Sequence, residues 1–204
     1  MKSLPLAGRS AGNAASFRTT NDSECSKKVS SSSTAAMQKP TLVAIDTNFP
    51  LMLAEGNDIA LEALSVVRQR LRSAKILIPP TVLVELNHHA RKSPDLQLRK
   101  SAQAALKNLL PLWRFHFAGL NSAQEAVVAG AAQRICSTGL VPAGEYNDAT
   151  IIAESAILNA ILLVSNDSHL LGIDHRRLGL LFRELDLPVP LIVSPREIVL
   201  KYYR

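Results

Sequence analysis

Short apolar runs alternate with longer amphipathic segments along most of this chain. Between the runs, apolar residues recur at helical spacing, and a final helical turn follows Pro195. Alternation of strand and helix is typical of a parallel sheet covered on both faces. The pattern therefore predicts a three-layer α/β/α sandwich with a central parallel sheet. The expected strands are 41–45, 74–78, 114–117, 160–164 and 190–193, and the expected helices are 58–73, 80–91, 95–110, 122–138, 145–159 and 175–186.

The segment 58–73 shows the helical pattern clearly. Asn57 precedes it, and an Asn side chain at this position accepts a hydrogen bond from a backbone N–H of the first turn. The apolar residues of the pattern are Ile59, Leu61, Leu64, Val67 and Leu71.

Residues 1–38 differ in composition from the rest of the chain. They are rich in Ser, Ala and Thr and show neither the strand nor the helix period. Such a segment buries too little apolar area to offset its chain entropy, so we expect a disordered basic Ser-rich leader before one globular domain over 39–204. Met37 offers an alternative start, which would leave residues 1–36 outside the protein. The leader lacks the apolar stretch of a secretory signal, whereas an organellar transit peptide stays open.

The net charge of +6 suggests an anionic partner, but half of it lies in residues 1–36. The other half is an ordinary solvated surface and is weak evidence for nucleic acid. No apolar stretch approaches the ~20 residues of a membrane helix. The two cysteines, Cys25 and Cys136, are isolated and lack metal-ligand spacing. These features predict a soluble, cytoplasmic protein without a membrane partner.

Four acidic residues fall near the carboxyl ends of predicted strands. Asp46 ends the first strand, and Asp167 follows the fourth. Glu85 lies about one turn into the helix after the second strand, and Asp148 lies near the start of a later helix. Because ligands of open α/β sheets bind beyond the carboxyl ends of the strands, we expect all four at one edge. Each taken alone has an ordinary explanation as a turn former, a helix cap, a partner of the helix dipole or a solvated residue.

Carboxylates crowded at one edge repel one another unless a cation lies between them or some are protonated. Oxygen ligands without His or Cys favour Mg²⁺ or Mn²⁺. Such an ion lowers the pKa of bound water and neutralises charge on a phosphodiester. The residues thus predict a phosphodiesterase, most simply a nuclease. Asn48 and Ser165 would orient the carboxylates by hydrogen bonds.

Three segments, VAIDTN (43–48), IPPTVLVELNHHA (78–90) and EYNDATIIAESAILNAILLVSNDSHL (145–170), together resemble the PIN-domain family in order and spacing. The resemblance runs from about Thr41 to the C-terminus. It implies the sheet order 3-2-1-4-5, a VapC-like metal-dependent ribonuclease and, commonly, a homodimer. The acidic Mg²⁺ or Mn²⁺ pocket of that family falls here on Asp46, Glu85, Asp148 and Asp167.

We therefore predict an endoribonuclease that hydrolyses RNA at these four carboxylates with one or two metal ions. Water would attack the phosphorus in line and leave a 5′-phosphate and a 3′-hydroxyl. Single-stranded or looped RNA is the favoured substrate, because an acidic pocket at a sheet edge must receive a splayed backbone. Many PIN-like proteins are toxins paired with an antitoxin, while others process ribosomal or messenger RNA, and the sequence does not choose among these roles.

Two alternatives come from other functional classes. One is a catalytically silent PIN-like module that binds RNA or a protein, although such a module has no reason to tolerate four crowded carboxylates. The other is a receiver-like domain, which needs a Lys after the last strand. Lys201 comes too late, since Ser194 and Pro195 already begin a new element.

Residues near the predicted site allow two interpretations each. Glu145, one turn before Asp148, is either a further ligand or a helix cap. The segment HHARK (88–92) either holds RNA phosphates or ends its helix in solvent with a favourable dipole interaction. Three aromatic residues are expected in the core or at an interface rather than as base-stacking groups: Trp113, Phe115 and Phe117.

Overall fold

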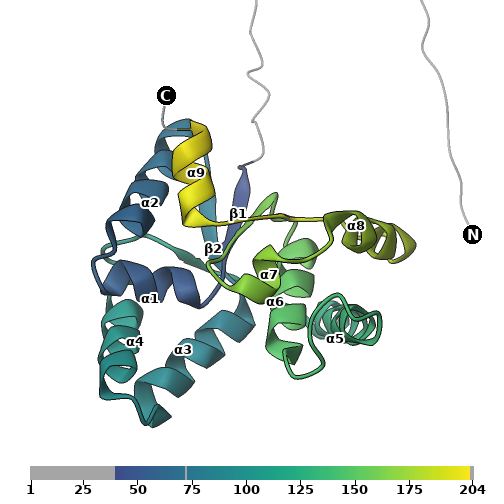
Figure 1. Cartoon of the computed structure of the whole chain (residues 1–204), viewed down its shortest axis with the longest axis horizontal. Helices are drawn as coiled ribbons and strands as arrows, with labels where there is room; N and C mark the ends of the chain where they lie inside the picture. Colours follow the sequence, from purple (N-terminus) through teal and green to yellow (C-terminus); the bar gives the residue numbers. More distant parts are fainter. Residues whose placement is uncertain (1–39, 72, 203–204) are drawn as a thin grey trace, which may run out of the picture. The chain divides into compact units, whose positions relative to one another are not determined.

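In the computed structural model, which describes residues 40–71 and 73–202, five parallel strands form a single sheet in the order β3-β2-β1-β4-β5 (Figure 1). The predicted sheet order and parallel α/β fold are confirmed. All the carboxyl ends of the strands lie at the same edge. The strands are β1 Leu42–Ile45, β2 Lys75–Ile78, β3 His116–Phe117, β4 Leu162–Val164 and β5 Leu191–Val193.

Helices surround this sheet. Helix α2 packs against α9, α5 packs against α6, and α3 contacts both α4 and α6. Figure 1 shows α2 and α9 on one side of the β1–β2 pair and α6 on the other. The bounds are α1 Asn48–Ala54, α2 Asp58–Arg70, α3 Pro80–Lys92, α4 Leu96–Asn108, α5 Ser122–Ser137, α6 Tyr146–Ile157, α7 Ser168–Leu171, α8 His175–Glu184 and α9 Pro195–Tyr202.

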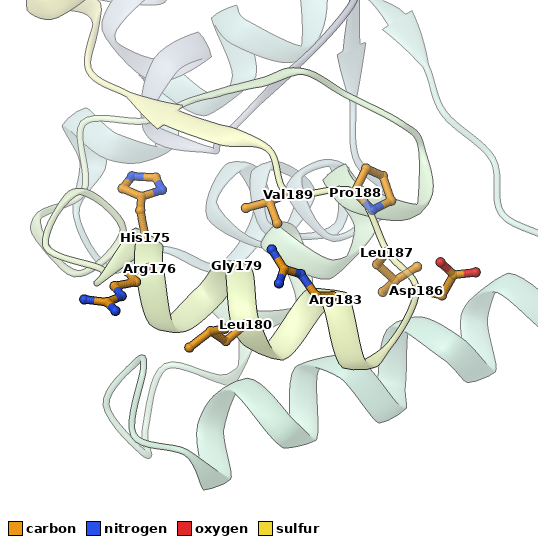
Figure 2. A pocket seen from close by; sticks show the side chains of 9 residues that line it. All are labelled: His175, Arg176, Gly179, Leu180, Arg183, Asp186, Leu187, Pro188 and Val189. Atoms are coloured by element: carbon orange, nitrogen blue, oxygen red, sulfur yellow. The ribbon is translucent and has the colours of Figure 1, made fainter.

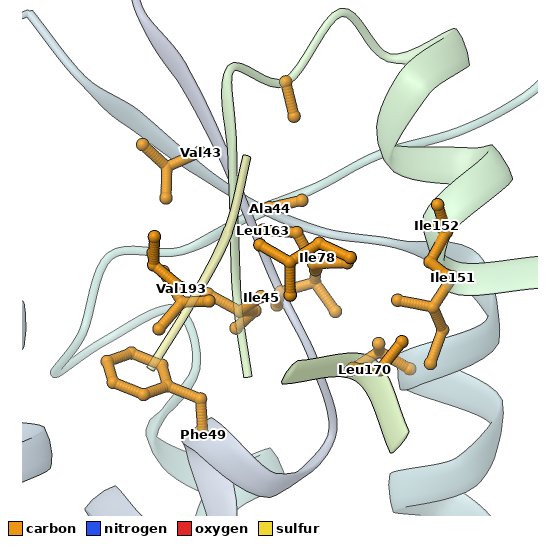
Figure 3. Packing of buried hydrophobic residues seen from close by; sticks show 14 of the residues in the cluster. Val43, Ala44, Ile45, Phe49, Ile78, Ile151, Ile152, Leu163, Leu170 and Val193 are labelled. Atoms are coloured by element: carbon orange, nitrogen blue, oxygen red, sulfur yellow. The ribbon is translucent and has the colours of Figure 1, made fainter. Parts of the chain in front are cut away.

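The central strand β1 is buried on both faces of the sheet. Its residues Val43, Ala44 and Ile45 are almost fully inaccessible to solvent. They belong to one apolar cluster with Leu163 of β4 and Phe49 of α1 (Figure 3). Burial of each large side chain contributes about 1.5–3 kcal/mol relative to its exposure. This packing makes β1 a rigid support for the residue that follows it, Asp46.

The helix predicted over 58–73 is present but ends earlier, at Arg70. Asn57 caps it, with its Oδ1 accepting from the backbone N–H of Ala60 at 3.1 Å, as predicted. Of its apolar residues, Leu64 and Val67 are buried, whereas Ile59 and Leu61 are 42% and 44% exposed. The helix also presents Ala60 and Ala63 to the core, since small side chains allow close packing. Leu71 ends the helix and is half-buried.

The predicted strand over 114–117 is reduced to the two residues of β3. The chain leaves α4 through tight turns, in which the N–H groups of Trp113 and Phe115 donate to carbonyls at the end of that helix. Arg114 between them has a φ of 45°. Trp113 and Phe115 are buried as expected, whereas Phe117 is half exposed. The short helices α1 and α7 were not predicted, because one or two turns carry too little periodic signal.

Some expectations concern the chain outside the part that the structure describes. The predicted leader, residues 1–38, lies there, and so does Cys25. Cys136 is a half-buried free thiol, and burial raises its pKa. Among the described residues, no helix combines the length and apolar character needed to cross a membrane.

Candidate active site

Asp46 extends the central strand by one residue. Its backbone N–H donates to the carbonyl of Val164 at 2.9 Å, which continues the pairing of β1 with β4 and leaves the side chain 3% exposed. Its Oδ2 accepts from Ser165 Oγ at 2.7 Å and from Asn48 Nδ2 at 3.3 Å, and its Oδ1 accepts from Thr47 N at 2.6 Å. Asn48 and Ser165 thus contact the carboxylate that the sequence analysis paired them with.

Burial raises the pKa of Asp46 to about 6. The hydrogen bonds from Ser165 and Thr47 act in the opposite direction, and the nearby charges of Glu85 and Asp167 raise it further. The carboxylate is therefore ionised at neutral pH against an unfavourable environment. A positive charge close to this carboxylate would therefore stabilise its ionised form.

Glu85 connects three elements. It lies on α3, and its Oε2 accepts a hydrogen bond from the Thr47 hydroxyl, which follows β1. Its Oε1 accepts from Asn147 Nδ2 of α6 at 2.7 Å. The sequence analysis noted that a Glu among apolar residues needs a partner. The structure supplies two, Thr47 and Asn147, neither of which the sequence analysis had identified.

Asp148 lies in the first turn of α6 and is half-buried. In the described part of the chain, its Oδ2 is the buried side-chain polar atom that has no hydrogen-bond partner. Burial raises its pKa to about 7, and the charges of Asp167, Asp46, Glu145 and Glu85 act in the same direction. A buried oxygen without a partner costs about 1–3 kcal/mol or more, so it calls for an explanation.

Asp167 follows β4 and begins α7. Its Oδ1 accepts from the backbone N–H groups of His169 at 2.7 Å and Leu170 at 3.4 Å, which makes it a helix cap. Its own N–H donates to Ser165 Oγ at 2.9 Å. Ser165 therefore links Asp167 to Asp46, since its hydroxyl contacts both residues. Asp167 is thus a helix cap through its Oδ1, and its Oδ2 takes no part in the capping.

The four predicted carboxylates are thus brought to one edge of the sheet, where they interact electrostatically. Within residues 40–71 and 73–202, however, no three Asp, Glu, His or Cys side chains form a ready-made metal-binding group. Each carboxylate except that of Asp148 is held by hydrogen bonds to its own neighbours. The donor set still fits a hard divalent cation: all the ligands are oxygens, two pKa values are raised, and one buried oxygen has no partner.

Glu154 is a buried acid that the sequence analysis missed. It lies on α6 with 4% exposure, and its carboxylate accepts from Thr81 N at 3.1 and 3.2 Å and from Thr81 Oγ1 at 2.8 Å. Burial raises its pKa, which the bonds from Thr81 oppose. Thr81 lies in the first turn of α3, one turn before Glu85. Glu154 therefore ties the helix that carries Glu85 to the helix that carries Asp148. A Glu within the apolar run IIAESAIL was the available signal.

Glu145 occupies the N-cap position of α6, where the capping interpretation placed it. Its side chain makes no capping hydrogen bond with α6. It does lie close enough to Asp148 to raise the pKa of that group. The geometry leaves Glu145 at the border of the acidic cluster, and a ligand role for it stays a prediction.

The segment 88–92 ends helix α3 beside Glu85. His88 and His89 line a surface hollow together with Val84, Glu85 and Asn147. The exposed Arg91 and Lys92 occupy the last turn of the helix, where positive charge interacts favourably with the helix dipole. The arrangement is compatible with either interpretation of this segment.

Comparison with known proteins supports the fold. No protein-family model and no curated protein matches this chain. Among solved structures, it is similar to a chain in the crystal structure of VapBC2 from Rickettsia felis bound to a DNA fragment from their promoter. The TM-score is 0.52 at 18% sequence identity, and the match covers 76% of this chain and 98% of that one. At this identity, the similarity establishes the architecture.

Proposed function

We propose that this protein is a metal-dependent endoribonuclease whose active site contains Asp46, Glu85, Asp148 and Asp167. The observation that carries the proposal is the unpartnered, buried Oδ2 of Asp148 among three other carboxylates at the carboxyl edge of the sheet. This oxygen and the raised pKa values of Asp46 and Asp148 are the state expected of metal ligands before they receive a cation.

In this proposal, Mg²⁺ or Mn²⁺, when bound, supplies the positive charge that activates water and neutralises the scissile phosphate. The chain supplies the positions of the ligands. Ser165 and Asn48 hold the carboxylate of Asp46, and Thr47 and Asn147 hold that of Glu85. Such supporting hydrogen bonds typically change metal affinity or activity about 10- to 100-fold.

We further propose RNA as the substrate, single-stranded or looped, and a toxin role in a toxin–antitoxin pair. The similarity to a chain of VapBC2 supports this role at the level of the fold. The PIN-like motifs support it at the level of residues. A small reading frame next to the gene, encoding a protein that binds and inhibits this one, would be direct evidence for the pair, and a homodimer is the expected assembly.

A second candidate is a catalytically silent module that binds RNA or a protein. It is favoured by one observation: within the described residues the acidic side chains do not form a ready-made metal-binding group. The two candidates differ in what a cation does. A nuclease must bind Mg²⁺ or Mn²⁺ at these carboxylates, whereas a silent module has no such requirement.

The deciding experiment measures both the binding of Mn²⁺ to the protein and the cleavage of RNA. A mixed-sequence single-stranded RNA is incubated with the protein in Mg²⁺, Mn²⁺ or EDTA, beside Asp46→Asn and a Glu125→Gln control. Glu125 is an exposed acid on α5 that takes no part in the site. The proposal predicts metal-dependent cleavage that the control retains and Asp46→Asn loses. Absence of both cleavage and Mn²⁺ binding in a folded protein would favour the silent module.

A further inference from the structure

A basic groove that shares no residue with the acidic cluster lies between α8 and the segment that leads into the edge strand β5 (Figure 2). On the helix, His175, Arg176 and Arg183 line it, together with Gly179 and Leu180. The other wall is formed by residues 186–189. Asp186 is the acidic residue among those that line the groove, so positive charge predominates there.

The arginines of this region fall into two groups. Arg177 donates to the Thr138 carbonyl at 2.7 Å, and Arg134 pairs with Glu184 at 2.6 Å. The guanidinium groups of Arg176 and Arg183, by contrast, have no hydrogen-bond or ion-pair partner in the described chain. The fold therefore uses two arginines structurally and leaves the two that line the groove available for an anion.

The shape of the groove follows from helical spacing. His175, Gly179 and Arg183 are four residues apart and share one side of α8, which spans about 12 Å between the first and the last of them. Gly179 has no side chain, and a Cβ built there would meet no atom within 4 Å. The glycine thus leaves a gap between two basic side chains. The exposed apolar residues Leu180 and Val189 border it.

The groove begins near the acidic edge of the sheet. His175 lies close enough to Glu197 to help lower the pKa of that carboxyl, and Glu197 Oε2 accepts from Ser194 N directly after β5. Strand β5 pairs with β4, so Ser194 is the neighbour of Ser165 across the sheet edge. From this edge α8 runs back along the outside of the sheet, as the connection between two parallel strands must.

We propose that this groove binds the sugar–phosphate backbone of a single-stranded RNA beyond the nucleotides at the acidic site. This inference rests on the proposed function for its ligand class. Free guanidinium groups bind phosphate oxygens, often bidentately, and also stack on bases. Apolar side chains next to basic ones suit unpaired nucleotides better than a purely anionic ligand. Arg176 and Arg183 are the main contacts.

The test measures RNA binding without cleavage. A fluorescein-labelled 16-nucleotide single-stranded RNA is titrated with the full chain in EDTA at several KCl concentrations, and anisotropy is recorded. The variants are Arg176→Gln/Arg183→Gln and Gly179→Leu, which fills the gap but keeps both charges. The control is Lys100→Gln/Lys107→Gln, which removes the same two positive charges from exposed positions on α4.

We expect the double arginine variant to bind at least tenfold more weakly, and the magnitude of its salt slope to fall by about 1.4, because each phosphate contact on a single strand contributes about 0.7. Gly179→Leu should weaken binding by blocking the groove, and the lysine control should change it less than twofold. Equal losses of RNA affinity in the arginine and lysine variants, or no RNA binding by the wild type, would overturn the proposal that the groove binds RNA.

Cleavage in Mg²⁺ or Mn²⁺ separates this inference from the proposed function. The arginine variant should raise KM for the 16-nucleotide RNA while keeping kcat, and it should leave cleavage of a tetranucleotide unchanged. If the wild type binds RNA in a way that depends on the two arginines but cleaves no RNA in either metal, the proposal that the groove binds RNA is supported and the proposed nuclease activity is overturned. Normal cleavage with an unchanged KM in the arginine variant would support the nuclease and overturn the proposal that the groove binds RNA.

Discussion

Helix α6 carries two acidic residues that differ in whether the fold supplies hydrogen-bond partners for their carboxylates. At its first turn, Asp148 keeps a buried oxygen without a partner and a pKa raised to about 7. Six residues further along the helix, Glu154 is more deeply buried, yet its carboxylate accepts hydrogen bonds from both the backbone and the hydroxyl of Thr81. The chain therefore can provide partners for an acid on this helix, and it does not do so for Asp148.

This difference in hydrogen bonding indicates which of the two acids supports the fold and which is suited to a catalytic role. A fully hydrogen-bonded acid such as Glu154 contributes to holding two helices together. An acid that lacks a partner, and is surrounded by other carboxylates, costs stability without serving the fold. This is why we assign the chemistry to the first turn of α6 and a positioning role to its third. The assignment leads to four predictions.

The largest effect should come from Asp148→Asn. Because supporting residues already cost about 10- to 100-fold, loss of a ligand should lower metal-dependent cleavage by at least about 100-fold. The folded state should be as stable as the wild type or more so in EDTA above pH 7, since a charge without a partner is removed. Cleavage assays and urea unfolding measure the two effects. Unimpaired cleavage would remove Asp148 from the site.

The opposite result is expected for Glu154→Ala. It leaves the N–H and hydroxyl of Thr81 without their acceptor, and each such loss destabilises by about 1–3 kcal/mol. Urea unfolding should show this decrease, and Glu154→Gln, which retains one acceptor oxygen, should show a smaller one. Because Glu154 holds the helix that carries Glu85, we expect the folded variant to bind Mn²⁺ more weakly than the wild type does. An unchanged Mn²⁺ affinity would confine the role of Glu154 to stability.

The pH dependence of stability sharpens the same contrast. In EDTA, the folded state holds a proton on Asp46 up to about pH 6 and on Asp148 up to about pH 7, whereas both lose it near pH 4 in the unfolded chain. Their contribution to stability is therefore complete below about pH 4 and is lost as the pH rises to 7. Thermal melting should show a falling Tm over this range. Asp148→Asn should flatten the fall, and Mn²⁺ should reverse it at pH 7 to 8.

The smallest effect is expected for Glu145→Gln. Glu145 ranks behind Asp167 and Asp46 among the charges that raise the pKa of Asp148, so its removal should lower that pKa slightly. We expect cleavage to change less than about threefold, because pairs of partly exposed charges interact by less than about 1 kcal/mol. The pH–rate profile measures the shift. A loss as large as that of Asp148→Asn would make Glu145 a ligand.

Much of this architecture could be predicted from periodicity. Strand and helix patterns are local, so the parallel sheet, the cap at Asn57 and the place of Asp46 after β1 follow from neighbouring residues. The prediction failed where local signals are weak or shared. Apolar character alone does not identify the core side of α2, because Ile59 and Leu61 are exposed while Ala60 and Ala63 are buried. The aromatic segment 114–117 looks like a strand, but only His116 and Phe117 pair in the sheet, because the chain is still leaving the turn after α4 at Arg114.

The sequence by itself determined which carboxylates stand near the ends of strands, since that depends on the order of residues along the chain. Only the tertiary structure decided how each is held. The bonds from Thr47 and Asn147 to Glu85 span 38 and 62 residues, that from Thr81 to Glu154 spans 73, and that from Ser165 to Asp46 spans 119. Hydrogen bonds and desolvation depend on distances in space, and packing sets those distances between segments that sequence patterns describe separately.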